Sequence, residues 1–380
     1  MVVAMPEQLV LPFGLAGAPG PSAAGEFRAG TRTLRVSECF DTYWRFAAER
    51  QRIFHRRAAG SPPPWTADPV LSRHKFTNVY RAADRVSQYL ITDVIYAGAQ
   101  DPAELVFRVL LFKVFNRIET WELLTGRLGA APAWDGYSFR DYDQILGEAM
   151  RRGERIYSAA YIVPNPPFGE PRKHGNHLRL IEHAMTGGLP AAVTAAGSLR
   201  EVYELLLALP SLGPFLAYQY AVDLAYSPAT GADESQFVVA GPGALDGISK
   251  CFTDTAGLTP AELVAWMHDT SRDHFTRLGL DFADLWGRWP TLIDLAERVL
   301  RGIEVHPRQP PARAGDRRAD PDQAGVPAGA GAGRLPVPAQ VGPAAGADRP
   351  AAGPVSGPAN VSDRARGSPA LGRVGISWAS

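Results

Sequence analysis

Apolar residues recur at helical spacing through most of the chain between residues 35 and 300. In residues 36–58, for example, Phe40 and Trp44 belong to an apolar face and arginines lie on the other side. This spacing is typical of an amphipathic helix. Comparable patterns predict helices at about 78–95, 101–124, 142–150, 176–186, 198–208, 214–225, 243–252, 260–277 and 281–300.

Local signals place some of the helix ends. Asp101 followed by Pro102 is a good start, because Asp is a strong N-cap and proline fits the first helical position. Thr77 or Asn78 would cap the helix before it. Residues 156–163 are apolar and short, so they fit either a strand or a buried piece of helix. Strands and helices do not alternate along the chain, which favours a mostly α-helical domain over a doubly wound sheet.

Composition divides the chain into three parts. Residues 1–34 are rich in Ala, Gly and Pro and are expected to be a flexible leader, whereas residues 35–300 hold the core-forming side chains. Residues 301–380 are an Ala-, Gly-, Pro- and Arg-rich tail that contains too little apolar surface to fold. Two explanations stay open for the tail: a genuine disordered segment, or a frameshift from about Leu295 in GC-rich coding DNA.

Charge and cysteine content narrow the class of protein. The 39 basic and 39 acidic residues give a formal net charge of zero, so any DNA-binding face must be local. Cys39 and Cys251 lack metal-ligand spacing, which favours a reduced cytoplasmic protein without a disulfide framework. No apolar run is long enough for a membrane span, and the amino-terminal stretch lacks the pattern of a signal peptide. We expect no metal and no cofactor.

The stretch Leu209–Ala217 has the form of a turn between two helices, with Pro210 and Gly213 at the positions that a helix-hairpin-helix unit requires. Gly213 is expected where the chain turns tightly and approaches another backbone. The following helix would offer free N–H groups to an anion such as a DNA phosphate. An ordinary helix-turn-helix corner is the alternative.

Several polar and aromatic clusters occur together in a fixed order. They lie at residues 75–85, 111–121, 156–161, 173–177, 215–220 and 239–244. As a set they resemble the helical domain of 5-hydroxymethyluracil DNA kinases, a family related to the α-glutamyl/putrescinyl thymine pyrophosphorylases of DNA base hypermodification. The resemblance covers about residues 38–295.

The resemblance implies a helical fold similar to helix-hairpin-helix DNA glycosylases, which flip a base out of the duplex. It also implies a reaction in which an amine or amino acid displaces (pyro)phosphate from the hydroxymethyl group of a modified uracil. The implied partners are DNA with modified thymine or uracil bases, an amine or amino-acid donor, and a separate P-loop DNA base kinase. This sequence lacks the Gly-x-x-x-x-Gly-Lys-Ser/Thr motif, which argues against kinase activity of its own.

Charged residues in these clusters supply the candidate chemistry. The glycosylase-like hairpin requires a carboxylate after it, and Asp246 and Asp223 are the best candidates. Lys113 joins them as a catalytic candidate, because only four lysines occur in the chain and three lie within the clusters. Candidates for binding substrate or DNA are Lys75, Asn78, Arg81, Asn116, Arg117, Lys173, His174, His177, Gly213 and Gln219.

Each candidate also has a structural interpretation. The carboxylates could cap helices or lie on the surface. Tyr157, Tyr161, Tyr218 and Tyr220 could stack on a flipped base or pack in the core. Arg117 and Glu119 do not share a helical face, so different partners are expected for them. His174 and His177 could share a face, but no third metal ligand stands near. Two other functions stay open: a non-catalytic DNA-binding module that recruits a kinase, and a DNA N-glycosylase.

Overall fold

Two helices that are buried on nearly every face organise the fold: α3 (Pro102–Phe115) and α9 (Pro214–Ala225). They belong to a computed structural model that describes residues 25–160 and 162–301. As expected, the Asp101 side chain accepts a hydrogen bond from the Ala103 N–H at 2.9 Å, and Pro102 opens α3. A helix that is apolar all round must lie in the interior.

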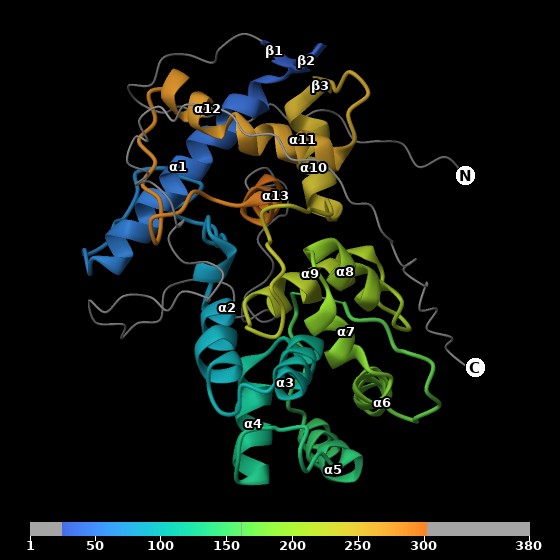
Figure 1. Ribbon diagram of the computed structural model, residues 1–380. Coiled ribbons are helices and arrows are strands. Elements are labelled where there is room, and N and C mark those ends of the chain that lie inside the picture. The colour runs from blue at the N-terminus through green and yellow to red at the C-terminus, as the bar shows by residue number, and fades with distance from the viewer. Residues whose placement is uncertain (1–24, 161, 302–380) are drawn as a thin grey trace, which may run out of the picture. The chain divides into compact units, whose positions relative to one another are not determined.

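One group of helices packs around α3 and α9 (Figure 1). The chain enters it through the short 3-10 turn η1 (Arg81–Ala83) and α2 (Arg85–Tyr89), followed by the π turn η2 (Leu90–Ile95). The remaining members are α4 (Ile118–Leu128), α5 (Phe139–Arg151), α6 (Lys173–Thr186), α7 (Leu189–Ala195) and α8 (Leu199–Leu207). Among them α6, α7 and α9 contact α3 directly, and α8 packs along α9.

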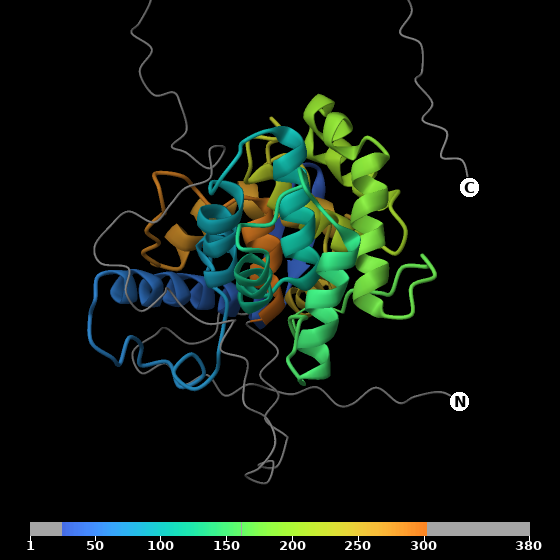
Figure 2. The same ribbon diagram turned by 90° about the horizontal axis from the view of Figure 1, so that it is seen from below.

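The second group brings both ends of the described chain together. It contains α1 (Glu38–Ala58), α10 (Pro242–Cys251), α11 (Pro260–Asp269), α12 (Ser271–Arg277) and α13 (Leu292–Arg301). Beside them, β1 (Glu26–Ala29), β2 (Arg32–Val36) and β3 (Phe252–Asp254) form an antiparallel sheet in the order β1-β2-β3. Figures 1 and 2 show α13 at the centre of the fold, where it also contacts η1.

The mostly helical class is confirmed, but several helix boundaries differ from the prediction. The expected helix at 78–95 is broken into η1, α2 and η2, and neither Thr77 nor Asn78 caps it. The expected helix at 101–124 is two helices, because Asn116 takes a left-handed conformation with φ 47° after α3. Residues 156–160 and 162–163 are neither strand nor helix.

Other differences lie nearer the chain ends. The segment expected as one helix at 260–277 is divided at Thr270, and the last helix begins only at Leu292. The expected leader at 1–34 contains β1 and most of β2, so the ordered part begins earlier than residue 35. The prediction for the tail falls on residues 302–380, which lie outside the described residues.

Candidate functional site

Three charged side chains meet in the interior between η1, α3 and α9. The Asp223 carboxylate lies 2.6 Å from Nη2 of Arg81 and 2.8 Å from Nζ of Lys113. The side chains of Arg81, Lys113 and Asp223 are only 7%, 3% and 2% exposed. The structure thus brings together Asp223 and two of the cationic candidates from segments far apart in the sequence.

Arg81 is fixed from several sides. Its Nη2 donates to Oε1 of Gln219 at 3.2 Å, and its Nη1 donates to the Tyr226 hydroxyl at 3.0 Å. Its backbone N–H donates to Oδ1 of Asp294 on α13 at 2.8 Å. Gln219 was expected at the site, whereas Tyr226 and Asp294 were missed. We call Arg81, Lys113, Gln219, Asp223 and Tyr226 the charged network.

Asp223 stays ionised despite its burial. Burial alone would raise the pKa of its carboxyl, but the charges of Arg81 and Lys113 and the hydrogen bonds from both lower the pKa below its usual value. The carboxylate is therefore a permanent negative charge at neutral pH. Such a group stabilises positive charge well and accepts a proton poorly.

A second buried carboxyl lies on the far side of Asp294. Thr291 donates its backbone N–H to Oδ2 of Asp294 at 2.9 Å, and its hydroxyl lies 3.5 Å from Oε1 of Glu234. Glu234 is paired with Arg288 at 3.0 Å. Burial raises the pKa of Glu234 to about 7, although the charge of Arg288 opposes this. These contacts connect α13 to the charged network through Arg81.

Another cluster of candidate residues lies where the segment between α5 and α6 crosses the end of α3. The His177 ring is hydrogen-bonded at both nitrogens, to the Tyr157 hydroxyl and the Pro164 carbonyl, each at 2.7 Å. Since a carbonyl only accepts, Nε2 carries the proton and Nδ1 accepts from Tyr157. Burial lowers the pKa of His177 to about 4, so the ring is neutral at pH 7.

Tyr157 offers a half-buried aromatic face in this cluster. Its ring lies 5.1 Å from that of Phe115, and Nζ of Lys173 lies 4.9 Å from its centroid. Tyr220 is fully buried nearby; burial, then the charges of Asp223 and Tyr157, raise the pKa of its hydroxyl. Within the described residues that hydroxyl has no hydrogen-bond partner. Tyr220 thus lies between the charged network and the Tyr157 cluster.

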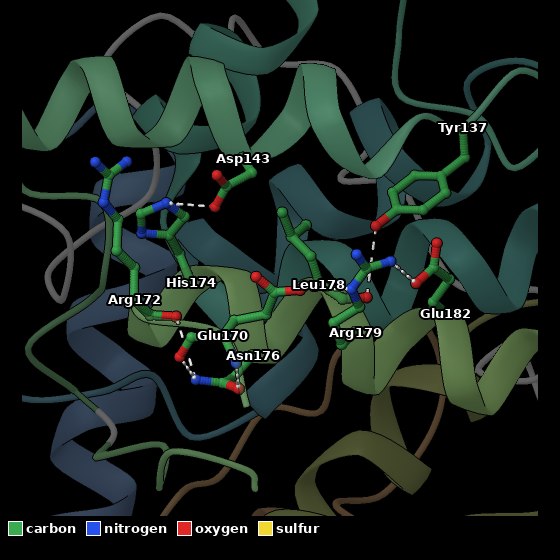
Figure 3. A network of polar contacts seen from close by, with 9 residues as sticks. All are labelled: Tyr137, Asp143, Glu170, Arg172, His174, Asn176, Leu178, Arg179 and Glu182. Atoms are coloured by element: carbon green, nitrogen blue, oxygen red, sulfur yellow. Dashed lines mark hydrogen bonds and ion pairs between the residues drawn. The ribbon is translucent and has the colours of Figure 1, made fainter. Parts of the chain in front are cut away.

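His174 has a different surrounding from His177, although both belong to α6. Its Nε2 lies 3.0 Å from Oδ1 of Asp143 on α5, which ties the two helices together (Figure 3). In the same figure, Oδ1 of Asn176 accepts from the Glu170 N–H at 2.9 Å, and its Nδ2 donates to the Glu170 carbonyl at 2.8 Å. Burial, opposed by Asp143, lowers the pKa of His174. These contacts position α6 and the residues that precede it.

The remaining candidates near the two clusters have local contacts. The Asn78 side chain donates to the Ala83 carbonyl at 2.8 Å, which closes the turn that contains Arg81. Lys75 is exposed in the same segment, and Asn116 is buried at the end of α3. Nε of Arg117 lies 3.4 Å from Oε2 of Glu119, so the expectation of separate partners was wrong. Arg117 precedes α4, and outside a regular helix a spacing of two does not separate side chains.

Gly213 and Asp246 differ most from their expected surroundings. Gly213 has φ −77° and caps α9, and a Cβ built on it would meet nothing within 4 Å. The left-handed residue of this turn is Ser211, with φ 66°. Asp246 lies on α10 with a side chain that is 44% exposed, paired with Lys250 at 2.6 Å. The structure does not bring Asp246 to the charged network.

Of the tyrosines expected to stack on a base, Tyr161 lies outside the described residues, and the other three differ in burial. Tyr218 is fully buried, and its hydroxyl donates to the Phe237 carbonyl at 3.1 Å. Tyr218 and Tyr220 are core residues, whereas Tyr157 is only half-buried. Within residues 25–160 and 162–301, no three His, Cys, Asp or Glu side chains are grouped to hold a metal ion. Among the described helices, none has the length and apolar character that a membrane span requires.

Comparison with known proteins gives two matches. Residues 37–299 match the family described as "5-hmdU DNA kinase, helical domain". The chain is also similar to the 5-hmdU DNA kinase of Bacillus phage SP10, with 28% identity over 271 residues. This alignment covers 64% of the chain and 41% of the phage protein, so the chain spans well under half of that relative's length. No solved structure matches the chain.

Proposed function

Because the chain belongs to the family of 5-hmdU DNA kinase helical domains, we propose that it acts on DNA containing 5-hydroxymethyluracil or bases derived from it. The match covers α1 to α13 and both clusters of candidate residues. The phage relative is named for the same modified nucleoside. A modified base becomes accessible to such a site only when it leaves the base stack.

The reaction that we propose is displacement of (pyro)phosphate from the base by an amine or amino acid. The amine nitrogen forms a bond to the exocyclic methylene carbon, and the bond from that carbon to the phosphate oxygen breaks. (Pyro)phosphate leaves with the bonding electron pair, and the new ammonium group releases its extra proton to water. The transition state places negative charge on the leaving group and positive charge on the attacking nitrogen.

The observation that carries this proposal is the buried meeting of Arg81, Lys113 and Asp223. Lys113 and Arg81 would stabilise the developing charge of the leaving group, as cationic side chains do in other phosphoryl sites. Asp223 would hold both cations in place and stabilise the ammonium that forms. Their burial strengthens each of these interactions, because the surroundings screen charge far less than water does.

A non-catalytic DNA-binding module is the second candidate. The same geometry supports it, because Arg81 and Lys113 already have an anionic partner in Asp223 and need no substrate to balance their charge. Buried ion pairs of this kind also hold structure together without any chemistry. In that case the domain would bind DNA with the modified base and present it to a separate kinase.

The two candidates are separated by nucleoside mass spectrometry. The full chain is incubated with DNA that carries 5-hydroxymethyluracil or its pyrophosphorylated form, together with an amino-acid mixture. A new nucleoside mass on the pyrophosphorylated DNA is the expected result. Unchanged nucleosides with retained DNA binding would overturn the transferase and support the module, whereas released free base would indicate a glycosylase.

Single substitutions test whether the charged network carries out the proposed reaction. Lys113→Met removes one cation and leaves Arg81 and Asp223 as a balanced pair, so it is the variant with the best prospect of folding. We expect it to lose about 100- to 1000-fold in rate, the range for removal of one preorganised electrostatic group. Asp269→Asn is the matched control, since that carboxylate is 78% exposed and paired only with His268. Equal rates for wild type and Lys113→Met would overturn the assignment.

A further inference from the structure

An exposed apolar side chain lies in the segment between α5 and α6, and we call its position the tip. The Ile162 side chain is 91% exposed, whereas the next most exposed large apolar residue in the described part of the chain is Met150 at 48%. Its neighbour Val163 is buried. Figure 2 shows this segment standing out from the helices. Covering a fully exposed isoleucine with apolar groups removes its side chain from water and lowers the free energy.

The base of this tip is held firmly. His177 bonds Tyr157 on one side of the tip and Pro164 on the other, so a single buried ring closes the loop. The Ser158 N–H donates to the Phe115 carbonyl at 2.8 Å, which fixes the same loop on the end of α3. Pro164, Pro166 and Pro167 restrict the backbone that follows. Tyr157 and Pro164, on either side of Ile162, are therefore both anchored by His177, and Ser158 is anchored on the last residue of the helix that carries Lys113.

The flanks of the tip are basic. Residues 151–173 contain five basic and two acidic side chains, although the whole chain has no net charge. Arg151 and Arg152 end α5, and Arg172 and Lys173 begin α6, all of them exposed. Positive side chains on both sides of an apolar tip match the phosphates that border the grooves of a duplex.

We propose that Ile162 is a wedge that enters the base stack of duplex DNA and fills the space left by the flipped base. This inference rests on the proposed function, since it requires DNA as the ligand. Apolar side chains that insert between bases are a known means of unstacking a duplex, and the inserted side chain leaves water as it does so.

The test uses the full chain and a duplex with one 5-hydroxymethyluracil next to 2-aminopurine, whose fluorescence rises when it is unstacked. Wild type is expected to bind and raise the fluorescence. Ile162→Ala is expected to lose about tenfold in duplex affinity and most of the fluorescence rise. Leu245→Ala is the control, because Leu245 is a partly exposed apolar residue on α10.

Single-stranded DNA of the same sequence separates the wedge from a folding defect. It has no stack to open, so Ile162→Ala is expected to bind it as well as wild type does. Equal fluorescence on the duplex for wild type and Ile162→Ala would overturn the wedge and leave the proposed function intact. Failure of wild type to bind either DNA would instead overturn the proposed function.

Discussion

Asp223 shows how much of this site depends on one residue. Its carboxylate is the shared partner of Arg81 and Lys113, which come from segments 142 and 110 positions away. The sequence pointed to Arg81 and Lys113 through their clusters and to Asp223 through the hairpin before it, but it could not show that they meet. It also favoured Asp246 equally, because spacing after the hairpin does not distinguish a buried carboxylate from one on the surface of α10.

Asp223→Asn is expected to destabilise the fold by about 3–5 kcal/mol, because it leaves two buried cations without the carboxylate that neutralises them. Lys113→Met should cost less, since Arg81 and Asp223 remain a balanced pair. Urea unfolding measures both. Asp246→Asn, which breaks an exposed ion pair, is expected to change the stability by no more than about 0.5 kcal/mol. An equally small loss for Asp223→Asn would show that the charged network does not stabilise the fold.

At the scale of elements, the spacing of apolar residues predicted most of the helices but few of the residues at which they begin and end. Asn116 divides one expected helix because it takes the left-handed conformation, which the apolar run around it hides. The last helix starts at Leu292, where Thr291 and Asp294 provide a capping spacing that could have been found in the sequence. Strand β3 was missed because its partner β2 lies more than 200 residues away in the sequence. The local β1–β2 hairpin was missed because the composition of residues 1–34 indicated a flexible leader.

Two glycines that cap helices before a proline give an element-scale prediction. A Cβ on Gly241 would lie 2.7 Å from the Phe215 ring, so Gly241→Ala must displace that ring and is expected to cost about 1–3 kcal/mol. Gly213→Ala meets nothing within 4 Å and should stay within about 0.5 kcal/mol of wild type. Thermal unfolding compares the pair. Equal losses would contradict the close packing of α9 against the start of α10.

At the scale of the whole molecule, the helical spacing of apolar residues predicted the mostly helical class. It did not predict how the two groups of helices meet. That junction is made by polar contacts between distant segments, above all Arg81 with Asp223 and Asp294. Hydrophobic spacing carries no information on such pairs. The positions of His177 and His274 in the interior were equally hidden, and both affect how the molecule responds to pH.

Acid is expected to destabilise the protein between pH 6.5 and 4.5. Burial lowers the pKa of His177 and His274 from 6.5 to about 4, so the unfolded chain binds two more protons there than the folded one. Glu234 opposes this, because burial raises its pKa from 4.5 to about 7 and the folded state binds one more proton. These three groups give a net difference of one proton and a loss of about 1.4 kcal/mol per pH unit, and the lowered pKa of His174 makes the loss steeper.

Urea unfolding at several pH values measures this slope. Glu234→Gln removes the opposing group, so the stability of this variant should fall more steeply on acidification than that of wild type, by about a further 1.4 kcal/mol per pH unit. A wild-type stability that is flat or rises as the pH falls through this range would contradict the burial of the two neutral histidines.

The central claim is that this domain recognises a 5-hydroxymethyluracil-derived base in DNA. The most direct test is the Kd of the full chain for two duplexes that differ only in one 5-hydroxymethyluracil or thymine, measured over a range of salt concentrations. We predict about tenfold tighter binding to the modified duplex, the value of one additional good polar contact, and a steep weakening with salt from phosphate contacts. Equal affinity for the two duplexes, or binding that does not change with salt, would contradict the claim.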